Sequence, residues 1–577
     1  MNPSTALATV LVDELLRGGV REVVLCPGSR SAPLAYAVHA AERAGLLRLH
    51  VRVDERSAGF LALGLAKGSG RPVPVVTTSG TAVANLHPAV LEAHHTGVGL
   101  VVLSADRPGE LRGTGANQTT VQPGIFGGAV AYTVDLPAAE SVPDQNAWWR
   151  STICRALAGA RRGPVHLNVG FREPLVPGRP GERDEVDTWP ELLDGRPSDA
   201  PWVSDQRSAP QSPAGPLLAH VPRTVVVLGS LEHAEDTVKV MDWARGHGCP
   251  VIAEPFGRIV PGAMPGGPLL LGCTRWLDAH APDRVVVVGR PTLARPVSAL
   301  LRRPGLRVEV VTRGEQWADP GRVAAAVHDF SVLGDLGYLA DQPADPPPGD
   351  AAWRAAWAAA GTAVDESVAE VLADQWGSGL AVARTVSDAL PSGASLVVGS
   401  SNPARDLDLT LERTVPKDLV VQANRGLAGI DGMVSTAVGI ALGSPRPTYA
   451  LLGDLTFLHD VNGLLLGPHE PRPDLTVVVV NDDGGGIFGL LEHGAPERAD
   501  TFERLFGTPT GTDLGALCRA HGIRHDVVGQ KRELAAAIAE PPRGLRVVEV
   551  RVDRSQHRPL HARLRQAVED RVNRLLP

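Results

Sequence analysis

Short apolar runs alternate with amphipathic stretches along most of the chain. In the first third, Val20–Leu25, Pro74–Thr78, Gly99–Ser104 and Pro164–Val169 have the length of strands, and Ala32–Ala44 has the alanine-rich periodicity of a helix. Runs that are apolar throughout are typical of strands buried on both faces, as in a parallel sheet covered by helices. This rhythm predicts a doubly wound α/β domain.

The same alternation of apolar runs and amphipathic stretches recurs in the middle and in the last part of the chain. Strands are predicted at Arg223–Leu228, Pro250–Ala253, Arg284–Val288, Leu306–Val311, Ser395–Val398, Leu419–Gln422, Thr448–Leu452, Leu475–Val480 and Leu545–Val550. Stretches rich in proline and charge at 172–216 and 341–350 indicate linkers, and Ala351–Val371 predicts a helix that enters the last series. We expect three α/β domains with doubly wound parallel sheets, at residues 1–178, 179–345 and 346–577, because 577 residues are too many for one core.

Composition narrows the function classes. A formal net charge of −8 argues against nonspecific nucleic-acid binding, which needs a positive field. No apolar stretch is long enough for a membrane span, and the N-terminus lacks the basic and apolar regions of a signal peptide. The five cysteines are scattered and show no CxxC pairing, so we expect reduced thiols in a cytoplasmic protein.

Polar residues follow two of the predicted strands in the last domain. Asp454 follows one strand, and Asn481, Asp482 and Asp483 follow the next, before the glycine run 484–486. Ligands of open parallel sheets bind beyond the carboxyl ends of the strands, and hard oxygen ligands suit Mg²⁺ that shares phosphate oxygens. An acidic residue at a strand end is often only a helix cap, but two such ends, 28 residues apart, can lie on neighbouring strands. The pattern predicts a site for a metal-bound diphosphate.

The first domain has an acid of its own. Glu55 follows the short β-like run His50–Val53 and precedes an apolar amphipathic helix. Taken alone, such a glutamate is most simply an acid that stabilises the first turn of the helix. The turn Thr78-Ser79-Gly80 also precedes a predicted helix, whose N-terminal N–H groups can bind an anion.

The strand-end residues of the last domain resemble a known motif. Gly453-Asp454, followed about thirty residues later by Asn481-Asp482, is similar to the thiamine-diphosphate motif, normally Gly-Asp-Gly ending in Asn-Asn. Leu455 replaces the third glycine, and Asp482 replaces an asparagine. The resemblance implies a thiamine-diphosphate-binding fold, with Mg²⁺ or Mn²⁺ held by Asp454, Asp482 and the carbonyl of Gly484. An alignment shifted by one residue would make Asn481 or Asp483 the ligand instead.

The same resemblance gives Glu55 a catalytic role. In thiamine-diphosphate enzymes, a glutamate at this place in the pyrimidine-binding domain hydrogen-bonds the cofactor ring nitrogen N1′. A carboxyl that shares a proton with N1′ helps the cofactor to form its nucleophilic ylid. The three domains would then be pyrimidine-binding, central and diphosphate-binding. An acid in the first domain together with the motif in the third is more specific than either alone.

Short sequence motifs around these residues narrow the resemblance to one family. They are Pro27–Pro33, Asp54–Arg56, Leu61–Lys67, Thr78–Asn85, Ser104–Pro108, Gly115–Gln118, Asn424–Gly432 and Gly484–Phe488. They resemble those of the 2-succinyl-5-enolpyruvyl-6-hydroxy-3-cyclohexene-1-carboxylate synthases, transferases of menaquinone biosynthesis. The resemblance implies decarboxylation of 2-oxoglutarate, then conjugate addition of the resulting carbanion to isochorismate. It is weak across the middle domain.

The resemblance also assigns site residues. For the cofactor they are Glu55, Thr78, Ser79, Gly80, Gly429, Ile430, Gly453, Asp454, Leu455, Asp482, Gly484, Gly485, Ile487 and Phe488. For the substrates they are Ser29, Arg30, Arg107, Asn117, Gln118, Arg295, Ser401, Arg405 and Arg425. The arginines suit substrates rich in carboxylates, which guanidinium groups bind in a bidentate manner. For the three apolar residues Ile430, Ile487 and Phe488, ordinary core packing is the alternative.

Two competing functions and an oligomeric state complete the expectations. The nearest alternative is another thiamine-diphosphate 2-oxoacid decarboxylase or carboligase, such as an acetolactate synthase, against which the arginine set argues. The alternative from another class is a noncatalytic nucleotide-binding regulatory protein. The family resemblance implies a homodimer or a dimer of dimers, in which Glu55 and Asp454 of one site come from different chains. Nucleic acid and membrane are not expected partners.

Overall fold

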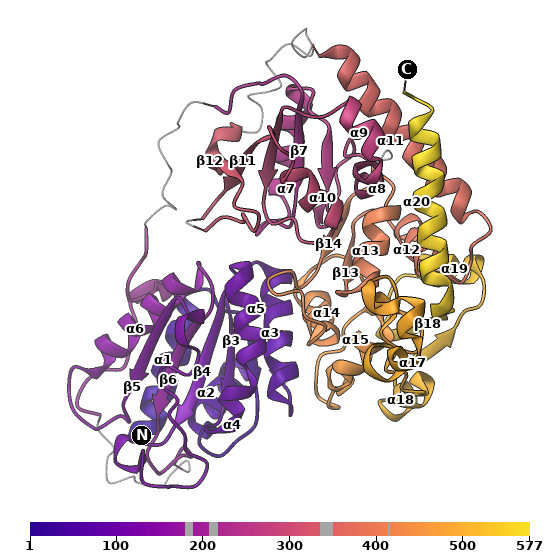
Figure 1. The fold of residues 1–577 in the computed structure, drawn as a ribbon. Helices are drawn as coiled ribbons and strands as arrows, with labels where there is room; N and C mark the ends of the chain where they lie inside the picture. Colours follow the sequence, from indigo (N-terminus) through magenta and orange to yellow (C-terminus); the bar gives the residue numbers. More distant parts are fainter. Residues whose placement is uncertain (179–188, 207–216, 315, 335–349, 414–415, 577) are drawn as a thin grey trace.

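Three separate β-sheets organise the protein (Figure 1). The computed structural model describes residues 1–178, 189–206, 217–314, 316–334, 350–413 and 416–576. The predicted linker 341–350 lies outside the described residues except for Asp350, and so do parts of the predicted linker 172–216. The described parts of 172–216 contain only the 3₁₀ turn Pro197–Asp199.

The first sheet has six parallel strands in the order β2-β1-β3-β4-β6-β5. The strands are β1 (Glu22–Leu25), β2 (Arg48–Val51), β3 (Val73–Thr77), β4 (Leu100–Asp106), β5 (Tyr132–Leu136) and β6 (Val165–Gly170). Helices α1 (Pro3–Arg17), α2 (Ala32–Arg43) and α6 (Gln145–Ala160) cover one face. Helices α3 (Glu55–Ser69), α4 (Thr81–Asn85) and α5 (His87–Thr96) follow on the other side, where α3 and α5 pack against the sheet.

The middle sheet has five parallel strands in the order β12-β11-β10-β7-β8. They are β7 (Thr224–Leu228), β8 (Val251–Ala253), β10 (Arg284–Val288), β11 (Arg307–Thr312) and β12 (Ala324–Asp329). Helix α7 (Asp236–Gly246) covers one face. The other face packs against α8 (Gly267–Gly272), α9 (Thr274–Ala279) and α10 (Arg295–Leu301).

The third sheet has seven strands in the order β17-β18-β16-β15-β13-β14-β9. Its parallel strands are β13 (Ala394–Val398), β14 (Leu419–Gln422), β15 (Thr448–Gly453), β16 (Leu475–Asn481), β17 (Arg524–Val527) and β18 (Leu545–Arg551). The edge strand β9 (Gly257–Arg258) comes from the middle of the chain and pairs antiparallel with β14. The predicted class of three parallel α/β sheets is confirmed, with β9 as the exception.

Helices cover both faces of this sheet. On one face lie α12 (Gly379–Ala389), α13 (Asn402–Thr410) and α19 (Lys531–Ala539). On the other lie α14 (Met433–Gly443), α15 (Asp454–His459) and α18 (Leu514–Ala520). The short helices α16 (Gly486–Gly489) and α17 (Ala499–Phe502) follow β16.

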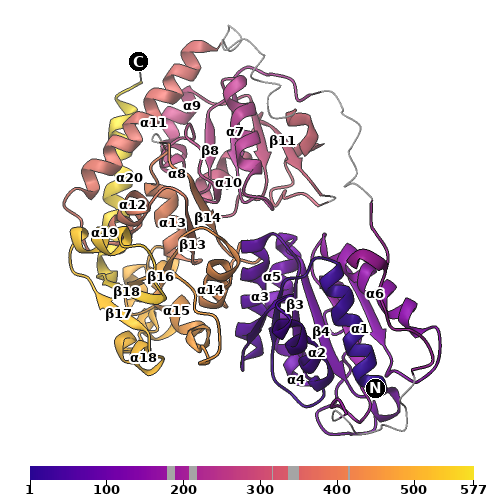
Figure 2. The same ribbon diagram turned by 180° about the vertical axis from the view of Figure 1, so that it is seen from behind.

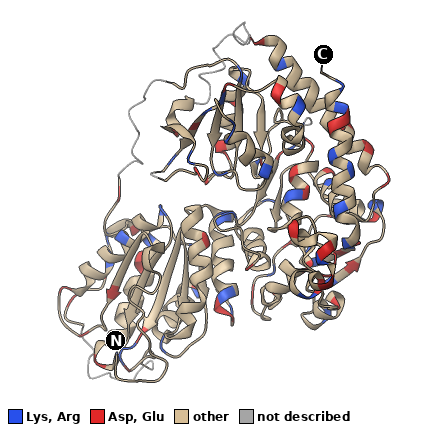
Figure 3. Cartoon of the chain, in the orientation of Figure 1, with Lys and Arg blue, Asp and Glu red and all other residues tan. Residues whose placement is uncertain are grey.

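Two long helices of the last third, one before and one after strands β13–β18, cover the middle sheet. They are α11 (Ala351–Leu372) and α20 (His557–Asn573), whose apolar side chains share a core with β7, β10 and β11. Figure 2 shows both helices side by side, with the C-terminus of the chain near them. Within the described residues, no helix has the length and apolarity that a membrane crossing requires. Lys, Arg, Asp and Glu are spread over all three units (Figure 3).

Helices α3 and α14 join the first and third sheets through one common core (Figure 1). Their backbones approach closely at glycines. A Cβ on Gly64 would lie 2.2 Å from the carbonyl oxygen of Thr436, and one on Gly439 would lie 2.4 Å from that of Leu61. Because backbone atoms cannot move aside as a flexible side chain can, these positions accept only glycine without displacing a helix.

We therefore expect Gly64→Ala to lower the free energy of unfolding by about 1–3 kcal/mol, as overpacking of a closely packed interface does. Thermal unfolding followed by circular dichroism measures the change. Gly272→Ala is the matched control, since a Cβ at Gly272 meets no atom within 4 Å. Equal melting temperatures for the two variants would contradict the close approach of α3 and α14.

Candidate active site

The ends of β15 and β16 bring two carboxylates together. The strands are parallel neighbours with Gly453 opposite Val480, so Asp454 and Asp482 leave the same edge of the sheet. Asp454 is buried, and its Oδ2 accepts a hydrogen bond from the Gly484 N–H at 2.8 Å. Burial and repulsion from Asp482 raise the pKa of Asp454. Two carboxylates that repel each other at a buried strand end are electrostatically suited to a bound cation.

The three polar residues after β16 have different surroundings. The side chain of Asn481 is occupied, because its amide donates to Glu549 Oε1 and its Oδ1 accepts the N–H of Asp483. Asp483 Oδ1 accepts the N–H groups of Thr510 and Gly511, both at 3.0 Å. Of the three, Asp482 is the one whose charge acts on Asp454.

The C-terminal helix supplies a partner for Asp482. His557, the first residue of α20, places its Nε2 3.2 Å from Asp482 Oδ2. Burial alone would lower the pKa of His557, but the neighbouring carboxylate of Asp482 and the charge of Asp406 raise it. The sequence carries no local signal for this contact, since 75 residues separate His557 from Asp482.

The glycines after Asp482 let other parts of the chain approach this turn closely. A Cβ on Gly486 would lie 1.9 Å from Asp482 Oδ2, and one on Gly484 would lie 2.0 Å from the carbonyl oxygen of Gly507. Gly484 also has φ of +147°, a conformation that other residues rarely adopt. Carboxylate and carbonyl oxygens fit a hard cation such as Mg²⁺. In the described parts of the chain, no group of three or more His, Cys, Asp or Glu is arranged to hold a metal ion.

Glu55 is the first residue of α3 and is held in place by the third sheet's loops. Asp54 caps the helix by accepting the N–H of Arg56, and its Oδ2 accepts the Asn462 amide at 2.8 Å. Ser57 donates to Asp460 Oδ1 at 3.0 Å. Glu55 is half-buried, and within the described residues its carboxylate makes no hydrogen bond or ion pair. The first turn of α3 is thus held in place while the Glu55 carboxylate stays free. No hydrogen bond or ion pair links Glu55 to Asp454 of the same chain.

Four predicted residues of the first domain form a network at the ends of β3 and β4. Arg107 Nη1 donates to Ser79 Oγ at 2.5 Å and to the Gln118 carbonyl at 2.9 Å, while Gln118 Nε2 donates to the Ser79 carbonyl. The Gly80 N–H donates to the buried side chain of Gln122, a residue that sequence reasoning missed. Thr78 is buried beside them, whereas Ser29 and Asn117 are exposed. Arg30 donates to the Phe171 carbonyl at 2.9 Å.

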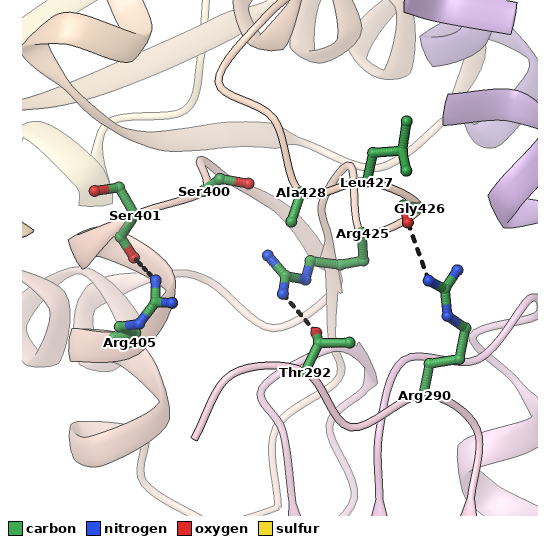
Figure 4. A pocket seen from close by; sticks show the side chains of 9 residues that line it. All are labelled: Arg290, Thr292, Ser400, Ser401, Arg405, Arg425, Gly426, Leu427 and Ala428. Atoms are coloured by element: carbon green, nitrogen blue, oxygen red, sulfur yellow. Dashed lines mark hydrogen bonds between the residues drawn. The ribbon is translucent and has the colours of Figure 1, made fainter. Parts of the chain in front are cut away.

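A cavity of about 290 Å³ lies between the middle and third sheets (Figure 4). Its lining includes the predicted Ser401, Arg405 and Arg425, together with Arg290, Thr292, Ser400, Gly426, Leu427 and Ala428. Arg425 donates to Thr292 Oγ1 at 2.5 Å, and Arg290 donates to the Gly426 carbonyl at 3.0 Å. Three arginines give the cavity a positively charged lining, which suits an anion.

Backbone strain marks the same cavity. Ser401, directly before α13, has φ of +81° and ψ of −142°, a combination that is costly for any residue with a Cβ. Its carbonyl accepts a hydrogen bond from Arg405 at 3.0 Å. The strained turn thereby helps to hold an arginine of the cavity.

Some predicted residues lie outside this cavity. Arg295 does not line it, and its guanidinium pairs on the surface with Glu492 at 2.8 Å. Arg290 and Thr292 were missed, although they follow β10 in the kind of strand-end loop that the prediction used elsewhere. The predicted residues of the first domain also line no part of it. The predicted substrate residues therefore fall into two groups within one chain.

The apolar residues next to the acidic strand ends are not core residues. Ile430 and Ile487 are half-buried, and Phe488 on α16 is 36% exposed. Leu455 and Gly429, also assigned to the cofactor, are half-buried as well, whereas Gly485 is buried. Core packing therefore does not account for the three apolar side chains.

Comparison with known proteins identifies the class. Residues 5–125 match the family of the thiamine pyrophosphate enzyme N-terminal TPP binding domain, and residues 409–550 match that of the C-terminal TPP binding domain. The structure of benzoylformate decarboxylase from Polynucleobacter necessarius superposes with a TM-score of 0.68 over 95% of this chain and 98% of that one, at 18% identity. The chain has the fold and the two binding domains of a thiamine-diphosphate-dependent enzyme.

Full-length relatives are more specific. The 2-succinyl-5-enolpyruvyl-6-hydroxy-3-cyclohexene-1-carboxylate synthase of Saccharopolyspora erythraea is 50% identical, over 98% of this chain and 99% of its own. The enzymes of that name from Rhodococcus jostii and Mycobacterium marinum are 48% and 46% identical over 98% of this chain, and over 99% and 100% of theirs. The chain belongs to the 2-succinyl-5-enolpyruvyl-6-hydroxy-3-cyclohexene-1-carboxylate synthase family.

Proposed function

We propose that this chain catalyses the synthase reaction of its family. It decarboxylates 2-oxoglutarate and joins the remaining four-carbon unit to isochorismate, which gives 2-succinyl-5-enolpyruvyl-6-hydroxy-3-cyclohexene-1-carboxylate and CO₂ for menaquinone biosynthesis. The observation that carries this proposal is the 46–50% identity to synthases over 98% of the chain. The acid Glu55 and the pair Asp454 and Asp482 supply the polar groups that the reaction needs.

Asp454, Asp482 and the carbonyl of Gly484 would hold Mg²⁺ or Mn²⁺ against the diphosphate. The proposal is supported by the mutual repulsion of the two carboxylates, which a divalent cation relieves. It is supported also by the side chains of Asn481 and Asp483, which are already engaged by other partners. His557 partly balances the additional charge of Asp482.

Thiamine diphosphate, when bound, supplies the electron sink for the decarboxylation. Glu55 would share a proton with the N1′ ring nitrogen and so favour the basic form of the adjacent amino group. We propose that Glu55 serves the diphosphate site of a partner chain in a homodimer, or in a dimer of dimers. Its free carboxylate, the lack of a bond to Asp454 of the same chain and the partly exposed Ile430, Ile487 and Phe488 support this assignment. A second chain would cover these side chains and exclude water.

The arginines would bind the substrate carboxylates. Arg405 and Arg425 line the cavity beside the diphosphate-binding sheet, and Arg30 and Arg107 lie at the strand ends of the first sheet. Two groups from two chains would then enclose two substrates. Holding both in register supplies much of the rate through orientation.

Replacing Arg405 by Lys keeps the charge but removes the bidentate fork. We expect KM for one of the two substrates to rise about tenfold, which corresponds to about 1.4 kcal/mol of binding, with a smaller change in kcat. Initial rates at varied 2-oxoglutarate and isochorismate measure both constants. Arg303→Lys is the control, because Arg303 lies on the surface of the middle unit and pairs with Asp278. A KM unchanged for both substrates would remove Arg405 from the substrate site.

The function itself is tested by product analysis. The protein is incubated with Mg²⁺, thiamine diphosphate, 2-oxoglutarate and isochorismate, and the product mass and the released CO₂ are measured. We expect one CO₂ for each adduct of the two substrates. An adduct formed from pyruvate, with none from isochorismate, would show another carboligase.

A further inference from the structure

A buried carboxyl of the middle unit lies behind the arginine cavity. Glu254 directly follows β8, and its Oε1 accepts the N–H groups of Thr292 and Leu293 at 2.5 and 2.6 Å. Thr292 Oγ1 in turn accepts the hydrogen bond from Arg425 Nη2. Glu254 thus connects to Arg425 through one residue. Glu254 lies between β8 of the middle sheet and β9 (Gly257–Arg258), which pairs with β14 of the third sheet. The carboxyl is therefore held between the two units.

The second oxygen of this carboxyl has no partner. Glu254 Oε2 and Arg425 Nε are both buried, and within the described residues neither makes a hydrogen bond. Such orphaned polar atoms are costly unless a charge or a ligand compensates them. The charged groups that face Glu254 are Arg425 after β14, with Arg405 and Asp408 on α13. Arg413 lies behind Asp408 and is also buried.

We propose that Glu254 is a positioning residue of the substrate cavity, which orients Arg425 through Thr292 and takes up a proton when a substrate carboxylate binds. This inference rests on the proposed function, because it treats the cavity as a substrate site. When Glu254 is ionised, it offsets part of the positive field of Arg405 and Arg425. When Glu254 is neutral, that field is available to the incoming carboxylate.

The acidity of Glu254 suits this exchange. Burial raises its pKa to about 7, although the backbone N–H groups of Leu293 and Thr292 and the charges of Arg425 and Arg405 oppose the rise. Below pH 7 the group is mostly neutral, and above pH 7 it is mostly ionised. A substrate carboxylate in the cavity adds negative charge nearby, which raises the pKa further and draws in a proton. Substrate affinity should therefore fall as the pH rises through 7.

The test is the pH dependence of KM for each substrate, measured on the holoenzyme from pH 6 to pH 8.5. For the wild type we expect one KM to rise about three- to tenfold across this range, since each pKa unit of coupling corresponds to a factor of ten. Glu254→Gln keeps the acceptor for Thr292 and Leu293 but cannot ionise, so its KM should stay near the low-pH value throughout. Glu232→Gln, an exposed carboxyl of the same unit, should keep the wild-type profile.

Thr292→Val separates orientation from charge. This change removes the oxygen that accepts a hydrogen bond from Arg425, but it keeps Glu254 and the backbone N–H that Glu254 accepts. We therefore expect KM to rise about tenfold at every pH and kcat to change less. The pH dependence of KM should be retained. Thr292→Ser, which restores the hydroxyl, should recover the wild-type KM. Titration calorimetry with glutarate, which resembles 2-oxoglutarate but cannot be decarboxylated, adds a direct proton count when repeated in two buffers of different ionisation enthalpy.

The outcomes are distinct. An inactive wild type overturns the proposed function, and this inference with it. An active wild type whose pH-dependent KM is matched by Glu254→Gln overturns this inference alone and moves the titration to another group, such as Asp408. A flat wild-type profile also overturns it. The inference is supported if KM is independent of pH in Glu254→Gln but not in the wild type. It also requires that KM rises in Thr292→Val and returns to the wild-type value in Thr292→Ser.

Discussion

Replacing Glu55 by Gln is expected to lower kcat by about 10²–10⁴-fold, the usual contribution of a positioned acid or base. Gln keeps the size of the side chain and its hydrogen-bonding oxygen but cannot hold the proton that N1′ requires. The first turn of α3 stays in place because Asp54 and Ser57, not Glu55, make its bonds to the third sheet's loops. Thiamine-diphosphate affinity should therefore change much less than kcat.

Steady-state rates and a cofactor titration followed by intrinsic fluorescence measure the two effects separately. Glu140→Gln, an exposed acid of the same domain, should behave as the wild type. Full activity in Glu55→Gln would leave Glu55 as nothing more than the acid of a helix N-terminus.

Asp454→Ala should have the second large effect, on cofactor binding. Loss of a residue that only supports a ligand costs about 10–100-fold in metal affinity, so loss of a ligand should cost about 100-fold or more. Asp454 also accepts the Gly484 N–H, so the variant should loosen the turn at Gly484 as well. Titration of the apo-protein with Mg²⁺ at fixed thiamine diphosphate measures the change.

Two variants after β16 identify the second ligand. Asp482→Asn keeps an oxygen at the site and removes the repulsion on Asp454, so cofactor binding should persist, whereas Asp482→Ala should lose it. Asp483→Ala should bind the cofactor as the wild type does, because Asp483 holds the loop at Thr510 and Gly511. Loss of metal in Asp483→Ala, but not in Asp482→Ala, would shift the assignment by one residue.

Buried strands and strand-end chemistry could be predicted from the sequence because both follow from local pattern. Leu475–Val480 is apolar throughout, as a strand covered on both faces must be, and it lies in β16. The carboxyl ends of neighbouring parallel strands meet at one edge of the sheet, so the sequence alone could place Asp454 near Asp482. Family membership is confirmed by the full-length relatives.

Several of the edge strands, and the contacts between distant elements, could not be predicted. Tyr132–Leu136 and Arg524–Val527 carry polar residues, because edge positions are partly solvated, and they resemble loops in sequence. Ala324–Asp329 begins with three alanines, which favour a helix, yet it pairs with β11. The contacts made by His557, Arg290 and Glu254 join elements far apart in the sequence. Local sequence patterns do not indicate such contacts. For Arg295 the role in substrate binding stays a prediction.

The middle unit is more than a spacer between the two cofactor-binding domains. It contributes β9 to the third sheet, and Arg290 and Thr292 to the arginine cavity. One of its loops also contacts the turn that carries Arg425, because Arg290 donates to the Gly426 carbonyl. From the first domain, Glu92 accepts the N–H groups of Gly426 and Leu427 in the same turn. All three units thus meet at the loop that carries Arg425.

The most direct test of a site shared by two chains is complementation between Glu55→Gln and Asp454→Ala. The two variants are co-expressed with different tags and compared with each variant alone. If a homodimer forms at random, half of the dimers are mixed and each has one intact site, so we predict about one quarter of the wild-type activity. Purified mixed dimers should reach about half. Mixed dimers as inactive as the two single variants would contradict the account, because then Glu55 and Asp454 of each site would have to come from the same chain.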